Sequence, residues 1–437
     1  MQPIAPDKVQ SVLAKHILAD GFDIIFDYKY SHGSYLVDAR DGRPYLDFFS
    51  MFGSMAVGYN HPHLIAHRDL FADIAINKTS NSDVYTTIYA QMVETFGRLG
   101  MPSYLPHAFF VDGGALAVEN ALKTAFDWKV RKNLEKGIHD KGHKVLHFKQ
   151  SFHGRSGYTL SMTNTADPRK YMYFPRFEWP RIHNPVMQFP QDAHNIAKVI
   201  VEENLALEEI DRALKLYKDD IAALIIEPIQ AEGGDNHFRA EFLQQLQQRA
   251  HEHEFLFICD EVQTGVALTG KFWAHEHFDI CPDIIAFGKK TQICGILAGE
   301  RIDEVSQNVF REASRINSTF GGNLVDMLRW TLILEVIEKE GLVTKAKLLG
   351  QFFINKLLQF GQDHSLVSNV RGRGLMCAFD LPSSEIRNAF ISYCKARGLL
   401  VLACGEKSVR FRPHLVVCEE EILLAMNIMY QVIQQDI

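Results

Sequence analysis

The stretch AFFVDGGALAVENALKTAF, residues 108–126, contains the first unit of the fold. Its opening run of apolar and aromatic residues ends at Asp112, and two glycines follow. The segment after the glycines places apolar side chains on one face of a helix, at Val118, Ala121, Leu122, Ala125 and Phe126. The stretch therefore predicts a buried strand that turns tightly at the glycines and continues into an amphipathic helix.

The same order of an apolar run beside a helical segment recurs along the middle of the chain. Four further runs have the length and composition of buried strands: KVLHF (144–148), AALIIE (222–227), FLFICD (255–260) and DIIAFG (283–288). Such runs, each next to a helix, are typical of a parallel sheet that is covered on both faces. The sequence thus predicts an α/β fold with a large, mostly parallel-sheet domain.

The domain organisation follows from a change of pattern along the chain. We assign residues 66–323 to the large domain and 324–437 to a smaller α+β domain, because a long helix (324–340) there leads into short strands and a further helix. Residues 1–65 contain strands and turns, with a plausible hairpin at Asp41-Gly42. We expect this N-terminal segment to pack with the small domain.

Composition limits the classes of function. The chain has 437 residues, of which 47% are hydrophobic and 23% charged, and its net charge is −7, so we expect no nucleic-acid partner. No run of about 18 or more apolar residues appears and the N-terminus lacks a signal-peptide core, so we expect no membrane span. The seven cysteines include no CxxC pair, and we expect reduced thiols, a cytoplasmic protein and no metal site.

Polar residues and glycines follow the ends of four predicted strands. These segments are Asp112-Gly-Gly, Glu227-Pro-Ile-Gln, Asp260-Glu-Val-Gln and Gly288-Lys-Lys. Ligands of open parallel sheets bind beyond the carboxyl ends of the strands. We therefore expect the four segments to form one composite site.

Asp260 and Lys289 are the most informative pair in that site. A carboxylate at the end of a buried strand needs a cationic or hydrogen-bonding partner, which a protonated pyridine nitrogen would provide. The alternative for Asp260 is an acid that caps the next helix. A lysine at the mouth of a dry pocket can lose its proton and form a Schiff base, and Lys290 is a competing candidate. The alternative is a solvated Lys-Lys pair.

Three further motifs suggest ligand contacts. Gly113-Gly114-Ala115 opens a helix whose N–H groups suit a phosphate, although a simple tight turn would have the same sequence. Phe152 could stack on a planar ring and Arg155 could bind a carboxylate, with core packing and a surface position as the alternatives. Arg412 lies in an apolar, strand-like run, where a buried guanidinium would need an anion.

Six blocks of the sequence, in this order, resemble the class III aminotransferases and together extend over nearly the whole chain. They are Asp112-Gly-Gly-Ala-Leu-Ala-Val-Glu-Asn-Ala, Ser151-Phe-His-Gly-Arg, Glu227-Pro-Ile-Gln-Ala-Glu-Gly-Gly, Asp260-Glu-Val-Gln-Thr-Gly, Phe287-Gly-Lys-Lys-Thr and Ser318-Thr-Phe-Gly-Gly-Asn. The resemblance implies the fold type I of PLP-dependent transferases and pyridoxal 5'-phosphate (PLP) as cofactor. Within the family, the chain most resembles enzymes that pass the ε-amine of L-lysine to 2-oxoglutarate. That implies L-2-aminoadipate 6-semialdehyde and L-glutamate as products of a ping-pong reaction.

The resemblance also implies roles for individual residues at the cofactor. Lys289 is expected to form the Schiff base and to shuttle the proton, and Asp260 to pair with the pyridinium nitrogen. The remaining expected contacts surround the ring and the phosphate: Phe152 and Val262 on the two ring faces, Gln263 at the phenolic oxygen, and the backbone of Gly113, Gly114 and Ala115 at the phosphate. Thr319 is expected to reach the phosphate of a neighbouring subunit, which implies a homodimer with shared active sites.

For the substrates, the resemblance implies that Arg155 holds the α-carboxylate of lysine and that Asn317 assists binding. Arg412 is expected to take the α-carboxylate of 2-oxoglutarate. Glu232 is expected to neutralise Arg412 while lysine is bound and to swing away for the oxoacid. A removable counter-ion would let one pocket accept both ligands, because specificity is a difference of affinities. The alternative is a permanent Glu232–Arg412 ion pair.

Three other functions remain open from the sequence alone. One is an ω-aminotransferase that acts on ornithine or 4-aminobutyrate. Another is an isomerase or racemase of the same fold, which would need no oxoacid. The third is an inactive relative that serves as a binding or regulatory protein, and the presence of both Asp260 and Lys289 argues against it.

Overall fold

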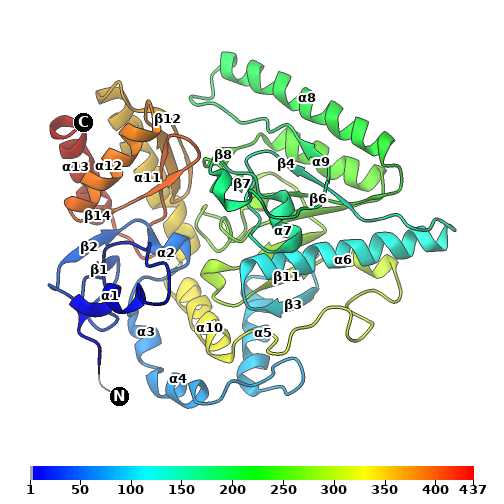
Figure 1. Cartoon of the computed structure of the whole chain (residues 1–437), viewed down its shortest axis with the longest axis horizontal. Coiled ribbons are helices and arrows are strands. Elements are labelled where there is room, and N and C mark those ends of the chain that lie inside the picture. The colour runs from blue at the N-terminus through cyan, green and yellow to red at the C-terminus, as the bar shows by residue number, and fades with distance from the viewer. Residues whose placement is uncertain (1–2) are drawn as a thin grey trace.

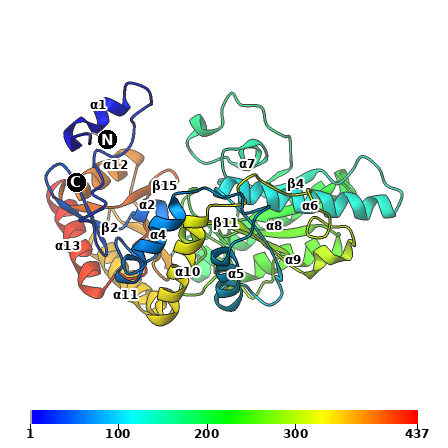
Figure 2. The ribbon, with the colours of Figure 1, turned by 90° about the horizontal axis from the view of Figure 1, so that it is seen from below.

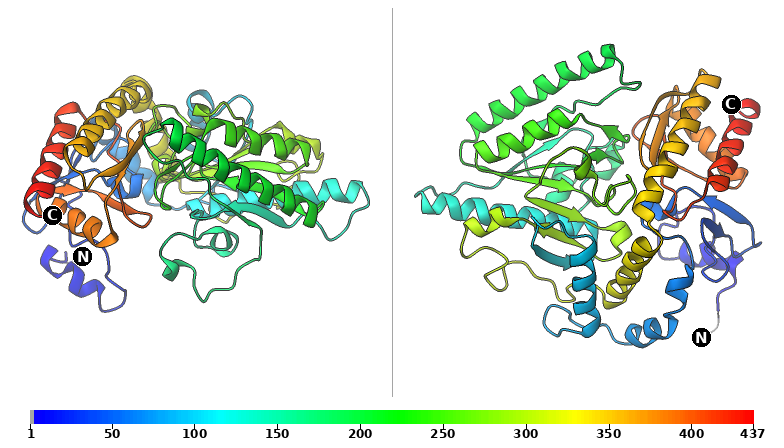
Figure 3. Two further views of the ribbon diagram at one scale, coloured as in Figure 1. Left: turned by 90° about the horizontal axis from the view of Figure 1, so that it is seen from above. Right: turned by 180° about the vertical axis from the view of Figure 1, so that it is seen from behind.

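The computed structural model describes residues 3–437, which form two lobes side by side (Figure 1). The larger lobe is built around a seven-stranded sheet. The first and last segments of the described residues lie in the smaller lobe, as the two further views in Figure 3 also show. Within the described residues, no helix combines the length and the apolar character needed to cross a membrane.

The large sheet confirms the predicted α/β fold. Its strands, in spatial order, are β3 (His107–Val111), β11 (Cys294–Ala298), β10 (Ile284–Phe287), β9 (Leu256–Asp260), β6 (Ile221–Ile226), β4 (Lys144–Phe148) and β5 (Arg181–Ile182). All five predicted apolar runs are strands of this sheet. The sequence reading missed β11, which runs antiparallel to both β10 and β3. The link between β10 and β11 is too short for a crossover helix, so the chain must reverse direction there.

Both faces of this sheet are buried, which explains why its strands are apolar throughout. In β9, Leu256 and Ile258 belong to the apolar cluster under α6 (Gly114–Glu135), whereas Phe257 and Cys259 belong to the cluster on the opposite face. That opposite cluster includes residues of α8 (Ala193–Leu216) and α9 (Ala240–Glu252). Figure 2 shows α6 and α9 on opposite sides of the sheet. The helix predicted after the two glycines is α6, and its predicted apolar face is the buried one.

The small lobe contains a four-stranded antiparallel sheet and three long helices. The strands, in spatial order, are β12 (Ser368–Arg373), β13 (Met376–Asp380), β16 (Ser408–Phe411) and β15 (Leu402–Cys404). The helices are α11 (Leu342–Asp363), α12 (Ser384–Ala396) and α13 (Glu419–Gln435). This arrangement of β strands and α helices agrees with the α+β character expected of the C-terminal part of the chain.

The N-terminal segment forms hydrogen bonds with the C-terminal part of the chain. Strands β1 (Tyr35–Val37) and β2 (Pro44–Asp47) form an antiparallel hairpin, and β2 also pairs in parallel with β14 (Leu399–Leu400). The hairpin turn contains Gly42 with φ +75°, a backbone conformation that favours glycine. The division of the chain at residues 66 and 324 stays a prediction.

Helix α10 (Leu324–Lys339) lies where the two lobes meet (Figure 3). It packs on α5 (Thr87–Leu99) of the large lobe, with the rings of Trp330 and Phe96 5.5 Å apart. The remaining short elements of the described residues are α1 (Val9–Leu13), α2 (Ser50–Gly53), α3 (Pro62–Ile65), α4 (Arg68–Ala75), α7 (Gly157–Met162), β7 (Ile229–Gln230) and β8 (Asn236–His237). Among the five 3-10 turns of the described residues, η2 (Pro168–Lys170) and η4 (Lys289–Thr291) contribute to the site.

Candidate active site

A pocket of about 290 Å³ lies beyond the carboxyl ends of the parallel strands. Its walls come from the start of α6 and from the segments after β4, β6, β9 and β10. The lining residues are Gly114, Ala115, Phe152, His153, Gly154, Arg155, Glu227, Glu232, Asp260, Val262, Gln263 and Lys289. Most of the residues singled out from the sequence therefore meet in one place. Gly113, Asn317, Thr319 and Arg412 do not line the pocket.

The pairing of β9 with β10 brings Asp260 and Lys289 to the same pocket. Ala286 of β10 pairs in register with Asp260, and Lys289 follows three residues later. Lys289 begins η4 with φ +55°, so its backbone is held in a left-handed conformation that costs energy for a lysine. Burial lowers the pKa of Lys289, and the nearby Arg410 lowers it further. A neutral amine is therefore easier to reach at this position than on the surface.

Lys290, the competing candidate, has a different environment. Its Nζ donates hydrogen bonds to the backbone carbonyls of Gln263 at 2.8 Å and Gly53 at 3.3 Å. Burial, and then the charge of Lys289, lowers the pKa of Lys290 to about 7. Lys290 does not line the pocket. The geometry thus favours Lys289 as the lysine that meets a ligand.

His153 holds Asp260 in place, and the sequence reading did not assign it a role. The Oδ2 atom of Asp260 lies 2.8 Å from Nδ1 of His153, and Oδ1 accepts a hydrogen bond from the backbone N–H of Val262 at 3.1 Å. Both side chains are buried, with 5% and 0% of their surface exposed. The sequence carries a signal for it, since His153 lies between Phe152 and Arg155 in the block Ser151-Phe-His-Gly-Arg.

Glu227 ties together two loops that line the pocket. Its Oε1 accepts the N–H of Phe152 at 2.9 Å and its Oε2 accepts the N–H of Ala231 at 3.1 Å. Burial raises the pKa of Glu227 to about 7, although His153 acts in the opposite direction. The carboxyl group therefore fixes the position of Phe152 relative to the turn that carries Glu232.

The start of α6 leaves room for a ligand close to its backbone. Gly113 has φ +98°, and Gly114 is the first residue of this 22-residue helix. A Cβ atom at Gly114 would lie 2.9 Å from Cγ1 of Val262, and one at Gly154 would lie 2.7 Å from Cβ of Ala115. Glycine at these positions therefore prevents steric clashes, and the N–H groups of the first helical turn can bind an anion. This end of the pocket fits the phosphate of PLP.

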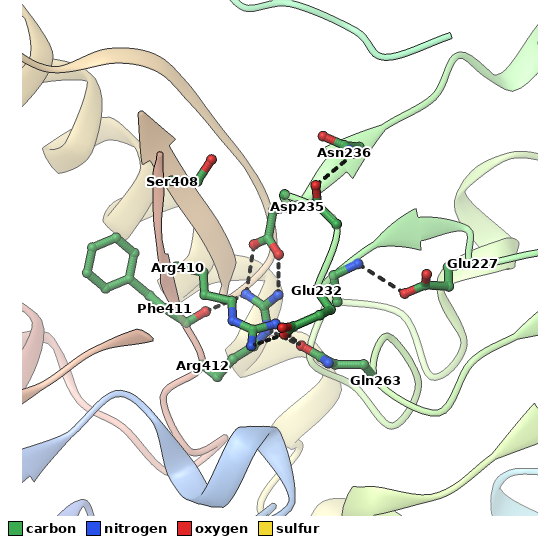
Figure 4. Close-up of polar contacts among 12 residues, drawn as sticks. Glu227, Glu232, Asp235, Asn236, Gln263, Ser408, Arg410, Phe411 and Arg412 are labelled. Atoms are coloured by element: carbon green, nitrogen blue, oxygen red, sulfur yellow. Dashed lines mark hydrogen bonds and ion pairs between the residues drawn. The ribbon is translucent and has the colours of Figure 1, made fainter. Parts of the chain in front are cut away.

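The expected pairing of Glu232 with Arg412 is wrong. Glu232 instead accepts a hydrogen bond from Nη2 of Arg410 at 2.7 Å (Figure 4). Arg410 lies on β16 and Arg412 directly follows the end of that strand, and both arginines have apolar neighbours in the sequence. The sequence pattern alone could not distinguish them. Burial acts to lower the pKa of Arg410, but Glu232 and other nearby groups raise it overall.

Arg412 is held in a separate ion pair. Its Nη1 lies 2.9 Å from Oδ2 of Asp235 and its Nη2 lies 2.5 Å from Oδ1, and both side chains are almost fully buried. Its Nε also donates to Oε1 of Gln263 at 3.1 Å. Because Asp235 and Gln263 already accept hydrogen bonds from this guanidinium, Arg412 fixes the position of Gln263 and of the turn that contains Asp235. Arg412 is thus paired with Asp235, and Arg410 is the arginine that pairs with Glu232.

Glu232 has a second cationic neighbour, which the sequence did not indicate. Nζ of Lys170, at the end of η2, lies 2.5 Å from Oε1 of Glu232. Burial raises the pKa of Glu232, but Arg410 and Lys170 outweigh it and the pKa is lowered overall. Glu232 is therefore a carboxylate between two cations. Lys170 lies in an irregular segment, for which sequence periodicity gives no prediction.

The remaining expected residues lie at or beyond the edge of the pocket. Arg155 lines the pocket and is exposed. Asn317 and Thr319 are exposed and outside the lining. The backbone carbonyl of Thr319 accepts a hydrogen bond from Ser80 Oγ at 2.5 Å. A role for Thr319 in the pocket of a second subunit stays a prediction.

Comparisons with known proteins agree with this geometry. A model of the family "Aminotransferase class-III" matches residues 18–433. The chain is 50% identical over 427 residues to the L-lysine-epsilon aminotransferase of Mycobacterium tuberculosis (strain ATCC 25618 / H37Rv), which covers 96% of this chain and 94% of that protein. The enzyme of the same name from Amycolatopsis lactamdurans is 48% identical, with 96% and 94% covered. Human mitochondrial 4-aminobutyrate aminotransferase is 31% identical, with 94% and 85% covered.

A solved structure of lysine aminotransferase from M. tuberculosis superposes with a TM-score of 0.96 at 48% identity, and the match covers 99% of both chains. The family model extends over nearly the whole chain, and its region includes every residue of the pocket. The protein therefore belongs to the class III family of PLP-dependent aminotransferases.

Proposed function

We propose that this aminotransferase moves the ε-amino group of L-lysine to 2-oxoglutarate and releases L-2-aminoadipate 6-semialdehyde and L-glutamate in a ping-pong reaction. The observation that carries the proposal is the ion pair between Glu232 and Arg410 in the pocket that contains Lys289. The similarity to lysine aminotransferases over nearly the full length supports the choice of lysine.

In this proposal, PLP supplies a carbonyl carbon that accepts the amine and a pyridine ring that withdraws electrons. Lys289 would be the amine that meets that carbon and the group that carries the proton, because burial lowers the pKa of its amine. Asp260 keeps the ring nitrogen protonated, and His153 keeps Asp260 in position. Phe152 and Val262 hold the two faces of the ring.

Gln263 is suited to hold the phenolic oxygen of the ring. Its Oε1 accepts hydrogen bonds from Nε of Arg412 at 3.1 Å and from Nη1 of Arg410 at 3.3 Å. Because the oxygen is bound to these two donors, the amide nitrogen of Gln263 is the atom left to donate towards the pocket. The arginines thereby set the orientation of this side chain.

The two substrates differ at the carbon that reacts. The terminal carbon of lysine carries an amine and no carboxylate, so a bare Arg410 beside it would remain unpaired. Glu232 neutralises Arg410 in that state, while Arg155 binds the distant α-carboxylate. The α-carboxylate of 2-oxoglutarate then displaces Glu232 from Arg410, and Arg155 binds its second carboxylate. A counter-ion that can leave thus allows one pocket to serve both half-reactions.

We also infer that two copies of the chain complete each other's sites in the cytoplasm. Thr319 and Asn317 are exposed and do not line the pocket of their own chain, which suits a contribution to the phosphate and substrate of a second copy. The seven cysteines are all free thiols, as expected in a reducing compartment.

Turnover on three amines tests the choice of substrate. With 2-oxoglutarate as acceptor, we expect kcat/KM for L-lysine to exceed that for L-ornithine and 4-aminobutyrate, because Arg155 would bind the α-carboxylate of lysine while its ε-amine meets the cofactor. Lysine turnover well below the other two would refute the assignment. Glutamate formation is measured in parallel, since an isomerase or racemase would form none from 2-oxoglutarate.

Arg410→Met is expected to impair mainly the oxoacid. The variant removes the guanidinium that would bind the α-carboxylate, so KM for 2-oxoglutarate should rise roughly 100-fold, equal to about 2.7 kcal/mol. The effect on lysine should be much smaller, because lysine places no carboxylate there. Steady-state kinetics with each substrate varied in turn gives both values. Equal losses of kcat/KM for lysine and for 2-oxoglutarate, with no recovery in Arg410→Lys, would contradict the role of Arg410 at the oxoacid carboxylate.

A further inference from the structure

Glu232 is bound to a different cation on each of its carboxylate oxygens. Oε2 lies 2.7 Å from Nη2 of Arg410, and Oε1 lies 2.5 Å from Nζ of Lys170. The cations come from different parts of the molecule, since Arg410 belongs to β16 in the small lobe and Lys170 ends η2 in the large lobe. The carboxylate can therefore lose one partner and keep the other.

The three side chains differ in exposure. The side chain of Arg410 is 3% exposed, that of Lys170 17%, and that of Glu232 26%. Lys170 is thus more exposed than Arg410 but less exposed than Glu232 itself. Its Nζ also lies 5.9 Å from the centre of the Phe152 ring. A rotation of Glu232 away from Arg410 and towards solvent would leave it beside Lys170.

The free-energy cost of rotating Glu232 away from Arg410 depends on whether its carboxylate keeps another ion pair. A half-buried carboxylate without a cation is costly, because its desolvation is no longer offset. With Lys170 present, one ion pair survives when a substrate carboxylate takes Arg410. Without Lys170, Glu232 would have Arg410 as its only cation and would resist displacement.

We propose that Lys170 is a positioning residue that retains Glu232 after Arg410 is released, and so makes the oxoacid half-reaction accessible. This inference rests on the proposed function, because it assigns a partner to the same removable counter-ion. It predicts an asymmetric effect: removal of the Lys170 charge should hinder the half-reaction in which Glu232 must leave Arg410, and should spare the half-reaction in which they stay paired.

The test measures the two half-reactions of the holoenzyme separately by stopped-flow absorbance of the cofactor. For Lys170→Met, we expect the apparent dissociation constant of 2-oxoglutarate, measured in its reaction with the aminated enzyme, to rise roughly tenfold. The single-turnover rate with lysine should stay within about twofold of the wild type. Lys170→Arg, which keeps a cation at the site, should restore the oxoacid half-reaction.

Arg169→Met provides a matched control, because Arg169 lies beside Lys170 on η2 but is exposed and pairs with Asp167. It should leave both half-reactions unchanged. Equal loss in both half-reactions of Lys170→Met, no change in either, or tighter oxoacid binding would each overturn the proposal. If Lys170→Met does not fold, as judged by its thermal melt, Lys170→Gln is measured against the same criteria.

The experiment separates this inference from the proposed function. The wild-type enzyme alone shows whether lysine donates its amine and 2-oxoglutarate accepts it. The ratio of variant to wild type then reports on Lys170. A wild type that reacts with lysine and a Lys170→Met variant with symmetric losses would refute the role of Lys170 and leave the substrate assignment intact.

Discussion

Lys289→Ala is expected to abolish transamination and to remove the visible absorbance band of the enzyme saturated with PLP. The side chain would supply both the covalent attachment and the proton carrier, so the rate should fall on the order of 10⁴-fold or more. A spectrum of the purified variant, followed by addition of lysine and 2-oxoglutarate, measures both effects.

Lys290→Met is the matched control for that substitution. Lys290 donates to the backbone carbonyls of Gln263 and Gly53 and does not line the pocket. Its loss should therefore lower the melting temperature, because two buried acceptors lose their donor, while the visible band remains. If the band persists in Lys289→Ala and disappears in Lys290→Met, the attachment site is Lys290.

Asp260→Asn is expected to reduce kcat by roughly 10²–10³-fold, the cost of removing one charge-assisted contact from a buried site. Asparagine keeps the shape of the side chain and can still form a hydrogen bond with His153. It lacks the negative charge that would keep the ring nitrogen protonated. Stopped-flow measurement of the lysine half-reaction isolates this loss from binding of the oxoacid.

Glu261→Gln controls for the loss of a buried negative charge at the end of β9. Glu261 is buried beside His275, with Oε1 3.0 Å from the ring Nδ1, and does not line the pocket. We expect its kcat to stay within about threefold of the wild type, with a lower melting temperature. Equal decreases in kcat for Asp260→Asn and Glu261→Gln would mean that Asp260 acts only through folding.

The fold was largely predictable because the sheet is buried on both faces. Runs such as FLFICD (255–260) must then be apolar at every position, and their polar ends mark the edge where ligands bind. Asp260 and Lys289 follow directly from that rule. The missed strand β11 runs antiparallel to β10, so its carboxyl end lies at the opposite edge of the sheet, and its direction depends on the length of a turn.

The charge network around Glu232 was less predictable for a physical reason. Arg410 and Arg412 are only two residues apart, at the end of β16 and just after it, and both have apolar neighbours in the sequence. Asp235, in the turn before β8, forms an ion pair with Arg412, and this leaves Arg410 as the partner of Glu232. Lys170 lies in an irregular segment, so only the three-dimensional structure brings it to the carboxylate.

The most direct measurement follows the nitrogen itself. The enzyme is incubated with 2-oxoglutarate and L-lysine that carries ¹⁵N either at the ε position or at the α position, and the glutamate formed is analysed by mass spectrometry. Transfer through the Glu232–Arg410 pocket predicts ¹⁵N-glutamate from the ε-labelled lysine and unlabelled glutamate from the α-labelled lysine. Label in glutamate from the α position, or no glutamate from either, would contradict the account.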